Sequence, residues 1–365
     1  MSWVRRLVGI VAVTVLGLGA TAHADVPAAP ARDFVAIEER GVVHVVDPAT
    51  GDVWEQLGGH GALASVAATS GHVYVSVAST DGSGTMVFAI WMPTAHRESI
   101  GHLPEVALAN RLSPTGDRLY VTAFVNGSPI TTPSATISLP LPDGGLTKPD
   151  NTAARDAGGG VLSPEGTRWY RLRTLWKEDR IEGVELQALA FQEGGTPIES
   201  TLRLPMSDYH SLLMAPNGRT LFAVDYGGAF NQQQTIHVID AGHDQPTLAR
   251  SIAIQRGPTK ALLCQAALSP QGDRLYVASH DGPARHGILV FDTDSWERVA
   301  HLRPDDAYRC LVVSPDGDRL YGAAKASGGY ALVTIDARTG AELRHVPLEL
   351  DSGCCPSVLL AVASE

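Results

Sequence analysis

One sequence pattern recurs at steps of 45 to 54 residues and strongly limits what this 365-residue chain can fold into. Each copy has an apolar run, a Ser-Pro-x-Gly break and a second apolar run with β-branched or aromatic residues. Five copies are clear and the first is degraded; together they occupy residues 67–78, 112–123, 162–173, 214–225, 268–279 and 310–324. Spacing of this kind is typical of repeat architectures, in which each copy is one supersecondary unit.

The break in each copy predicts a tight turn between two strands. In the last copy, CLVVSPDGDRLYGAA, proline presets φ for the second position of a type I turn and Asp316 suits the next position. Gly317 then takes the positive φ that closes the hairpin. We interpret Ser314 and Asp316 as turn residues rather than catalytic ones, because the motif recurs along the chain and one copy has Ala215 in place of serine.

The repeat predicts an all-β fold, a seven-bladed β-propeller. Each repeat supplies about four strands with period-two alternation and no helical pattern between them. Six turn glycines mark six blades, at 71, 116, 166, 218, 272 and 317. Residues 34–57 supply three more strands and residues 357–364 one. We expect these N- and C-terminal strands to pair as a seventh blade that closes the ring and removes free edges.

The repeat elements Ser-Pro-Asp-Gly, Leu-Tyr-Val and Val-Ile-Asp resemble the YVTN-type repeats of exported bacterial and archaeal propellers. The resemblance places the chain near the superfamily that includes quinohaemoprotein amine dehydrogenase β-chains, and it covers nearly all of residues 34–365. No Trp-Asp dipeptide occurs, which argues against the WD-repeat class. The segment 107–156 departs most, because its Pro-rich stretch predicts a long loop or distorted outer strands.

The N-terminus predicts export. Residues 1–24 have Arg5 and Arg6, an apolar run and a small-residue cleavage site, as in a secretory signal peptide, and residues 25–33 resemble a flexible leader. We therefore expect a periplasmic or secreted protein with one propeller domain at 34–365. Without the signal peptide the chain has 26 basic and 39 acidic residues, which disfavours nucleic acid as a partner, and no membrane span is predicted.

Candidate binding residues come from the loops that enter the innermost strands. In a propeller these loops lie near the mouth of the central channel. In this sequence they correspond to positions seven to eleven residues before each turn glycine. The positions found in this way are His60, Glu105, Asp156, His210, Cys264 and Cys310, with Cys354 and Cys355 before the last strand. No metal site is predicted, because Cys-x-x-Cys and His-x-x-x-His spacings are absent.

The four cysteines, Cys264, Cys310, Cys354 and Cys355, lie at this one position in the last three blades. An exported protein with an even number of cysteines is expected to oxidise them. A bond between Cys354 and Cys355 would be strained, because consecutive Cα atoms lie about 3.8 Å apart. We expect two disulfides between neighbouring entry loops, which leaves their connectivity open.

Three functions fit these features. The first is a non-catalytic module that binds a ligand or protein at the channel mouth, because no catalytic Ser-His-Asp order or Gly-rich phosphate loop occurs. The second is a propeller subunit of a periplasmic oxidoreductase whose cofactors belong to a companion polypeptide, as the amine dehydrogenase resemblance implies. No cofactor is predicted in this chain; the Asp-x-x-Thr-Gly hairpins at 47–54 and 336–343 resemble quinoprotein alcohol dehydrogenase repeats, but their tryptophan does not recur.

The third function is lactone hydrolysis. Residues 209–228 resemble lactonase propellers of the phosphogluconolactonase type locally, which implies roles for His210 and Asp225. The next blade departs from that family, because it has Thr259, Lys260 and Ala261 where the family has an Arg-His pair.

Overall fold

Strands and tight turns make up the part of the chain that the computed structural model describes. The described residues are 33–39, 42–58, 64–69, 72–78, 84–91, 96–103, 106–112, 118–124, 135–140, 160–163, 168–177, 180–190, 198–206, 210–226, 233–256, 266–280, 286–326, 329–348 and 358–363. Within these ranges every regular element is a β-strand. The predicted all-β class is therefore confirmed for the described residues.

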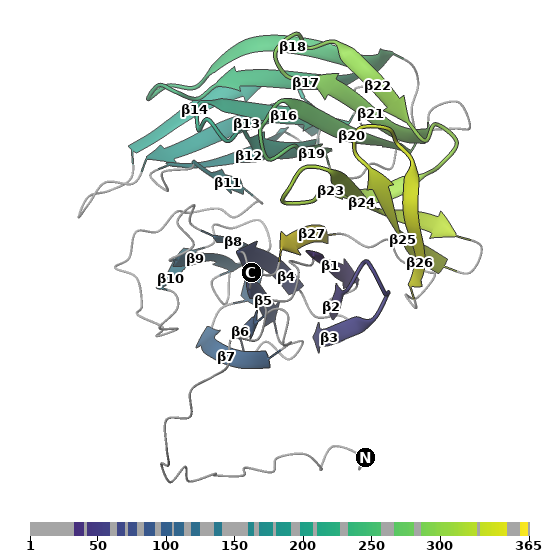
Figure 1. The fold of residues 1–365 in the computed structure, drawn as a ribbon. Helices are drawn as coiled ribbons and strands as arrows, with labels where there is room; N and C mark the ends of the chain where they lie inside the picture. The colour runs from purple at the N-terminus through teal and green to yellow at the C-terminus, as the bar shows by residue number, and fades with distance from the viewer. Residues whose placement is uncertain are drawn as a thin grey trace, which may run out of the picture. The chain divides into compact units, whose positions relative to one another are not determined.

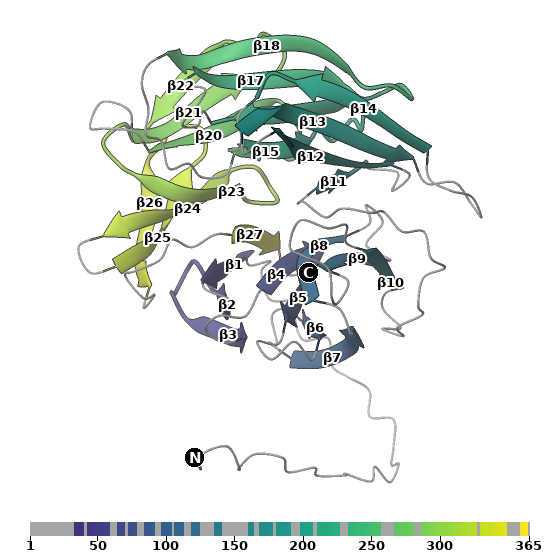
Figure 2. The same cartoon turned by 180° about the vertical axis from the view of Figure 1, so that it is seen from behind.

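The described strands form small antiparallel sheets in which hairpins join neighbouring strands (Figures 1 and 2). The N-terminal half forms three sheets, β1-β2-β3, β4-β5-β6-β7 and β8-β9-β10, and the C-terminal strand β27 adds to the first of them beside β1. Their bounds are β27 Val358–Ala363, β1 Asp33–Glu39, β2 Val42–Val46, β3 Val53–Gly58, β4 Ala64–Thr69, β5 His72–Ala78, β6 Thr85–Trp91, β7 His96–Leu103, β8 Val106–Leu112, β9 Arg118–Phe124 and β10 Ala135–Pro140.

The C-terminal half continues with four-stranded sheets in strict chain order. Their strands are β11 Gly160–Leu162, β12 Arg168–Lys177, β13 Arg180–Ala190, β14 Ile198–Leu204, β15 His210–Met214, β16 Thr220–Asp225, β17 Gln233–Asp240, β18 Thr247–Arg256, β19 Ala266–Leu268, β20 Arg274–His280, β21 His286–Asp292, β22 Arg298–Leu302, β23 Tyr308–Val313, β24 Arg319–Ala326, β25 Gly329–Asp336 and β26 Glu342–Leu348. The first strand of each sheet contacts the first strand of the next sheet, in the series β11, β15, β19, β23, β27, β4 and β8.

The last described strand, β27, pairs with the first, β1, from Asp33 opposite Ala363 to Glu38 opposite Val358. Strand β1 thus begins one residue before the expected start of the domain at 34. The Asp33 carboxylate, 8% exposed, accepts a hydrogen bond from Tyr321 and lies 3.3 Å from the Arg319 guanidinium. Burial raises the pKa of Tyr321, and the Asp33 charge raises it further, so the phenol stays protonated and donates.

Alternation along each strand supplies both faces of a sheet with apolar side chains. In β24, Leu320 and Ala324 pack toward sheet β19–β22, whereas Tyr321 and Ala323 pack toward β1. The same division continues along β25, where Val333 faces the first cluster. A strand that is buried on both faces reads as a nearly continuous apolar run, as the repeat does, because successive side chains point to opposite faces.

The Ser-Pro-x-Gly turn has the geometry that its sequence predicts. Ser314 is fully buried; its amide donates to the Arg319 carbonyl at 2.8 Å, and its hydroxyl accepts the Arg319 amide at 3.0 Å. Gly317 has φ +85° and donates to the Ser314 carbonyl at 2.9 Å. The interpretation of Ser314 and Asp316 as turn residues is confirmed, because their polar atoms bond within the hairpin.

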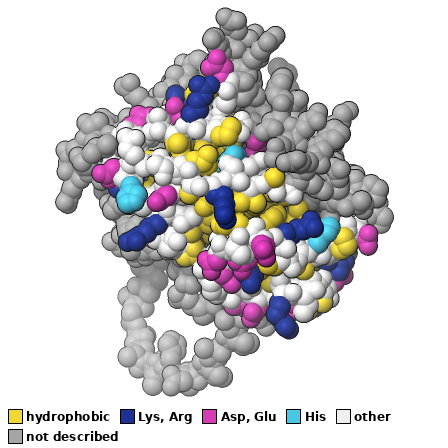
Figure 3. Space-filling view, turned by 90° about the horizontal axis from the view of Figure 1, so that it is seen from above, with side chains coloured by type: hydrophobic (Ala, Val, Ile, Leu, Met, Phe, Trp, Pro, Cys, Tyr) yellow, Lys and Arg dark blue, Asp and Glu magenta, His cyan; other side chains and the backbone are white. Residues whose placement is uncertain are grey.

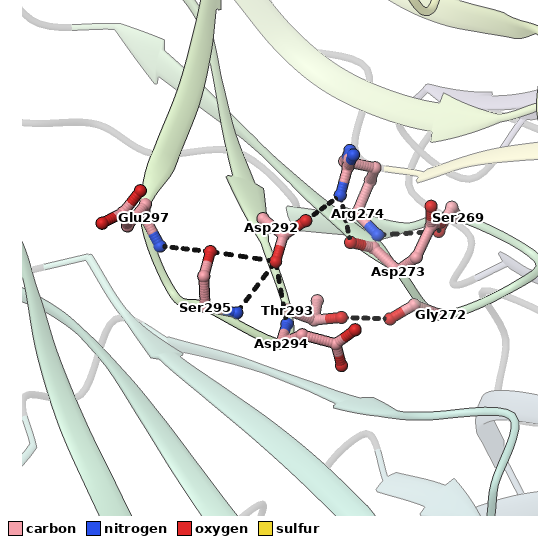
Figure 4. A network of polar contacts seen from close by, with 9 residues as sticks. All are labelled: Ser269, Gly272, Asp273, Arg274, Asp292, Thr293, Asp294, Ser295 and Glu297. Carbon is pink, nitrogen blue, oxygen red and sulfur yellow. Dashed lines mark hydrogen bonds and ion pairs between the residues drawn. The ribbon is translucent and has the colours of Figure 1, made fainter.

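A second kind of turn joins the third and fourth strands of sheet β19–β22 and contacts the Ser-Pro-x-Gly turn of the same sheet, at residues 269–272 (Figure 4). The Asp292 carboxylate accepts hydrogen bonds from the Ser295 amide and hydroxyl and from the Asp294 amide, which, with Arg274, lower the pKa of Asp292 to about 2. Thr293 donates its hydroxyl to the Gly272 carbonyl at 2.6 Å and so ties the two turns together. The Asp-x-x-Thr-Gly hairpin at Asp336 has the same bonds. These aspartates are structural turn residues.

Candidate functional site

A cavity of about 400 Å³ lies over sheet β23–β26, where the chain crosses from β22 to β23. Its charged lining consists of Arg303, Asp305, Asp306, Glu342 and His345. Ala307, Ala324 and Val333 supply its apolar lining, and Ala324 and Val333 are buried in the core beneath. Ligand sites in proteins usually combine an apolar surface with a few convergent polar groups and have volumes of several hundred Å³, so this cavity has the size and character of one.

Arg303 organises the cavity from the residue directly after β22. It has φ +47°, which is uncommon outside glycine, and its carbonyl accepts the Asp306 amide at 3.1 Å. The guanidinium pairs with the Asp306 carboxylate and donates to Glu342 Oε2 at 2.7 Å. Burial lowers the pKa of Arg303, but the Asp306 and Glu342 carboxylates outweigh it, so the net shift is upward and the guanidinium stays charged. Arg303 therefore links the crossing loop to β26.

Tyr308 holds Asp306 from the core side. Its side chain is fully buried, and its hydroxyl donates to Asp306 Oδ2 at 3.0 Å. Burial raises the pKa of Tyr308, and the Asp306 charge raises it further. The ring lies over Gly322 so closely that a Cβ there would be 2.6 Å from Tyr308 Cδ1. Glycine at 322 thus makes room for the ring that positions Asp306.

Asp305 and His345 are the titratable groups of the lining with the most freedom. Asp305 is exposed, and no hydrogen bond or ion pair joins its side chain to another described residue. His345 is 45% exposed, and its Nδ1 lies 3.7 Å from Oε1 of Glu342 on the same strand. A bound molecule could contact both groups without breaking the Arg303 pairs.

The predicted site residues are only partly within the described part of the chain. His60, Glu105, Asp156, Cys264, Cys354 and Cys355 lie outside it. His210 begins β15, with its Cα opposite that of Asp225 in the ladder. Cys310 lies on β23 and is buried against β1, on the sheet face away from the cavity. The two disulfides among the four cysteines therefore stay predictions.

The sequence did contain a signal for the cavity. His60 and Glu105 precede their turn glycines by eleven residues, and the same count back from Gly317 leads to Asp306. The predicted residue in that copy was Cys310, seven positions before Gly317. A second signal is Gly322, which replaces the valine of the Leu-Tyr-Val element at 121 and 277. Nothing local in the sequence pointed to Arg303 or Glu342.

A separate buried polar pair lies in sheet β15–β18. Asp225 is fully buried, and His237 is 2% exposed. His237 Nδ1 is 2.9 Å from Ser251 Oγ, whereas its Nε2 is buried and has no hydrogen-bond partner in the described structure. Because Asp225 has no surface in contact with solvent, a substrate cannot reach its carboxylate in this conformation.

We predict that His237 makes folding sensitive to mild acid. Burial lowers its pKa, although the Asp225 charge opposes the shift, so the folded state holds the ring neutral. The contribution of neutral His237 to the free energy of unfolding is complete above the unfolded pKa of about 6.5. That contribution declines as pH falls below this value, by at most about 1.4 kcal/mol per pH unit. Urea unfolding at pH 7.5 and 5.5 should show a smaller loss for His237→Gln than for the wild type.

His44 offers a second test of the same effect, because burial lowers its pKa in the same direction. The His44→Gln variant should remove the part of the stability loss between pH 7.5 and 5.5 that His44 causes. The part that His237 causes should remain. An unchanged loss between pH 7.5 and 5.5 in His237→Gln would contradict the prediction.

Charge is mixed over the surface that Figure 3 displays, where acidic, basic and apolar side chains are interspersed. The described residues contain no group of three or more His, Cys, Asp or Glu side chains arranged to hold a metal ion. Across the same residues, no helix has the length and apolar character needed to span a membrane.

Solved structures share this fold at low sequence identity. A putative 6-phosphogluconolactonase from Bacteroides fragilis NCTC 9343 is 13% identical, with a TM-score of 0.61 over 91% of this chain and 98% of that chain. A functionally unknown protein from Desulfotomaculum acetoxidans DSM 771 is 12% identical, with a TM-score of 0.60 over 91% and 99%. Hydrazine synthase from Kuenenia stuttgartiensis is 16% identical, with a TM-score of 0.57 over 82% and 90%.

These likenesses support the β-propeller fold and no particular activity, because fold alone does not determine function. No protein-family model and no curated protein matches the sequence.

Proposed function

We propose that this chain is an exported β-propeller of the YVTN repeat type, with seven blades, that binds a small ligand in the cavity beside Arg303 without catalysing a reaction. The successive small sheets support the blade count, and the pairing of β27 with β1 supports closure of the ring. The signal-like segment 1–24 supports export to the periplasm or the medium.

The observation that carries the proposal is the lining of the cavity. Its apolar surface and its charged rim are held in place by Arg303, which spans from the loop after β22 to Glu342 on β26. A preorganised rim favours binding, because little side-chain order must be created when the ligand arrives.

The burial of Asp225 favours binding over lactone hydrolysis. The lactonase resemblance gave this aspartate a role at the substrate, but its carboxylate is fully buried. Lactone hydrolysis that is lost in both His210→Ala and Asp225→Ala, with folding retained, would revive the hydrolase hypothesis. A cofactor-bearing polypeptide that co-purifies from the native source would instead favour the oxidoreductase-subunit hypothesis.

The proposal predicts that a bulky residue at 307 blocks the cavity. Ala307 lines it from the crossing loop, and an indole there would occupy the space of a ligand. In a thermal-shift screen of small metabolites, a true ligand at about ten times its Kd should raise the Tm of the wild type by about 2 °C. The Ala307→Trp variant should show no such shift.

The matched control is Ala253→Trp, on the exposed outer strand β18, which should respond as the wild type does. A screen with no stabilising compound, or a ligand that stabilises Ala307→Trp equally, would contradict ligand binding at this cavity.

A further inference from the structure

We infer that the cavity beside Arg303 selects a small organic cation, an ammonium or guanidinium group on a short apolar chain. This inference rests on the proposed function, since it names the ligand class of the same cavity. It draws on the charge of the lining, on which of those charges are already paired, and on the apolar floor.

The lining has an excess of negative charge. Asp305, Asp306 and Glu342 contribute three carboxylates, whereas Arg303 is the permanent cation and His345 is neutral unless protonated. An anionic ligand would have to approach two uncompensated negative charges in a partly enclosed space, where solvent screens them less than on an open surface. A cation would neutralise part of that charge.

Existing pairs decide which carboxylate receives the cation. Asp306 is held by Arg303 and by the Tyr308 hydroxyl, and Glu342 accepts from Arg303 at 2.7 Å. Asp305, next to Asp306 in the same loop, has no such partner among the described residues. Asp305 is therefore the carboxylate with full capacity to accept hydrogen bonds from an ammonium or guanidinium group.

The same pairs also argue against an anion site at Arg303. Two N–H groups of its guanidinium contact carboxylates, with Nε toward Asp306 and Nη2 toward Glu342. An anionic ligand at Arg303 would therefore lie next to both of these carboxylates and be repelled by them. Arg303 therefore stabilises the arrangement of Asp306 and Glu342 at the rim.

The floor of the cavity favours an apolar chain behind the charged group. Val333 is 2% exposed and Ala324 is 9% exposed, and Ala307 adds a methyl group from the loop. A volume of about 400 Å³ accepts a chain of several methylene groups together with one charged head. Burial of that chain supplies affinity, and the Asp305 contact supplies selectivity.

The test compares three probes of equal chain length with different charge. Isothermal titration calorimetry at low salt would measure binding of hexylamine, 1-hexanol and hexanoate to the wild type, Asp305→Asn and Asp294→Asn. Asp294 is a matched control, because it is an exposed aspartate in the β21–β22 turn and is not part of the cavity lining. We expect hexylamine to bind most tightly, and Asp305→Asn to weaken it about three- to tenfold while Asp294→Asn leaves it unchanged.

The outcomes separate this inference from the proposed function. If hexanol or hexanoate binds as tightly as hexylamine and Ala307→Trp abolishes that binding, the cavity binds ligands but the cation inference is wrong. If Asp305→Asn and Asp294→Asn weaken hexylamine equally, the effect is one of net charge and the inference is again wrong. If no probe binds and the metabolite screen is also empty, the proposed function fails as well.

Discussion

A chain that lacks residues 357–365 is expected to lose cooperative folding at room temperature or to unfold at least 10 °C below the full chain. Strand β27 pairs with β1 over six residues, and it contacts the first strands β4 and β23 of the neighbouring sheets. Its removal would expose one edge of β1, whose residues Phe34 to Ile37 are fully buried, and would leave backbone groups without partners. The combined loss is several kcal/mol, comparable with the stability of a whole domain.

Thermal unfolding followed by circular dichroism would measure this effect. A deletion of residues 25–31, which precede β1, is the control and should leave the Tm nearly unchanged. A synthetic peptide of residues 357–365 should raise the Tm of the truncated chain in a concentration-dependent way. A truncated chain as stable as the full chain would show that the β1–β27 pairing does not close a ring.

Gly287→Ala is expected to destabilise the protein by about 2–4 kcal/mol and to weaken ligand binding at the cavity. Gly287 lies in β21 with φ +97°, and a Cβ there would be 2.4 Å from the carbonyl oxygens of both Leu302 and Arg303. These atoms are backbone, so the clash can be relieved only if the chain moves where Arg303 begins the cavity rim. The variant therefore tests fold and site together.

Gly242→Ala is the matched control for Gly287→Ala. Gly242 lies in the exposed β17–β18 turn, and a Cβ there would meet only side-chain atoms, at 3.3 Å or more. Its effect on the urea midpoint should be within about 0.5 kcal/mol. If Gly287→Ala is equally mild and binds ligand as the wild type does, the close approach at Leu302 and Arg303 does not constrain the cavity.

The turns were predictable because their chemistry is local. Ser314, Asp316 and Gly317 bond to atoms within five residues, and the motif recurs, so one copy explains the others. The pairing of the chain ends was also anticipated, because the strand count left three strands at one terminus and one at the other. The seven-bladed ring stays a proposal that the truncation tests.

The binding cavity was not predictable in the same way. Asp306 lay at the expected distance from Gly317, yet its place in the cavity depends on Arg303, which is anchored in turn by Glu342 on a distant strand. The pairing of Arg303 with Glu342 joins residues 39 positions apart, and it forms because β26 returns beside the crossing loop. The register of β24 to β26 determines which side chains share that face.

The sequence by itself determined the strand periodicity, the turns and the all-β class, because each of these depends on contacts within one hairpin and on an alternation that repeats. Only the tertiary structure decided which charged groups meet at the cavity and which of them are already paired. That outcome depends on the packing of successive sheets, on the space that Gly322 leaves for Tyr308, and on the close approach that Gly287 allows. The contact between Arg303 and Glu342 joins residues 39 positions apart, and no local pattern contains a record of it.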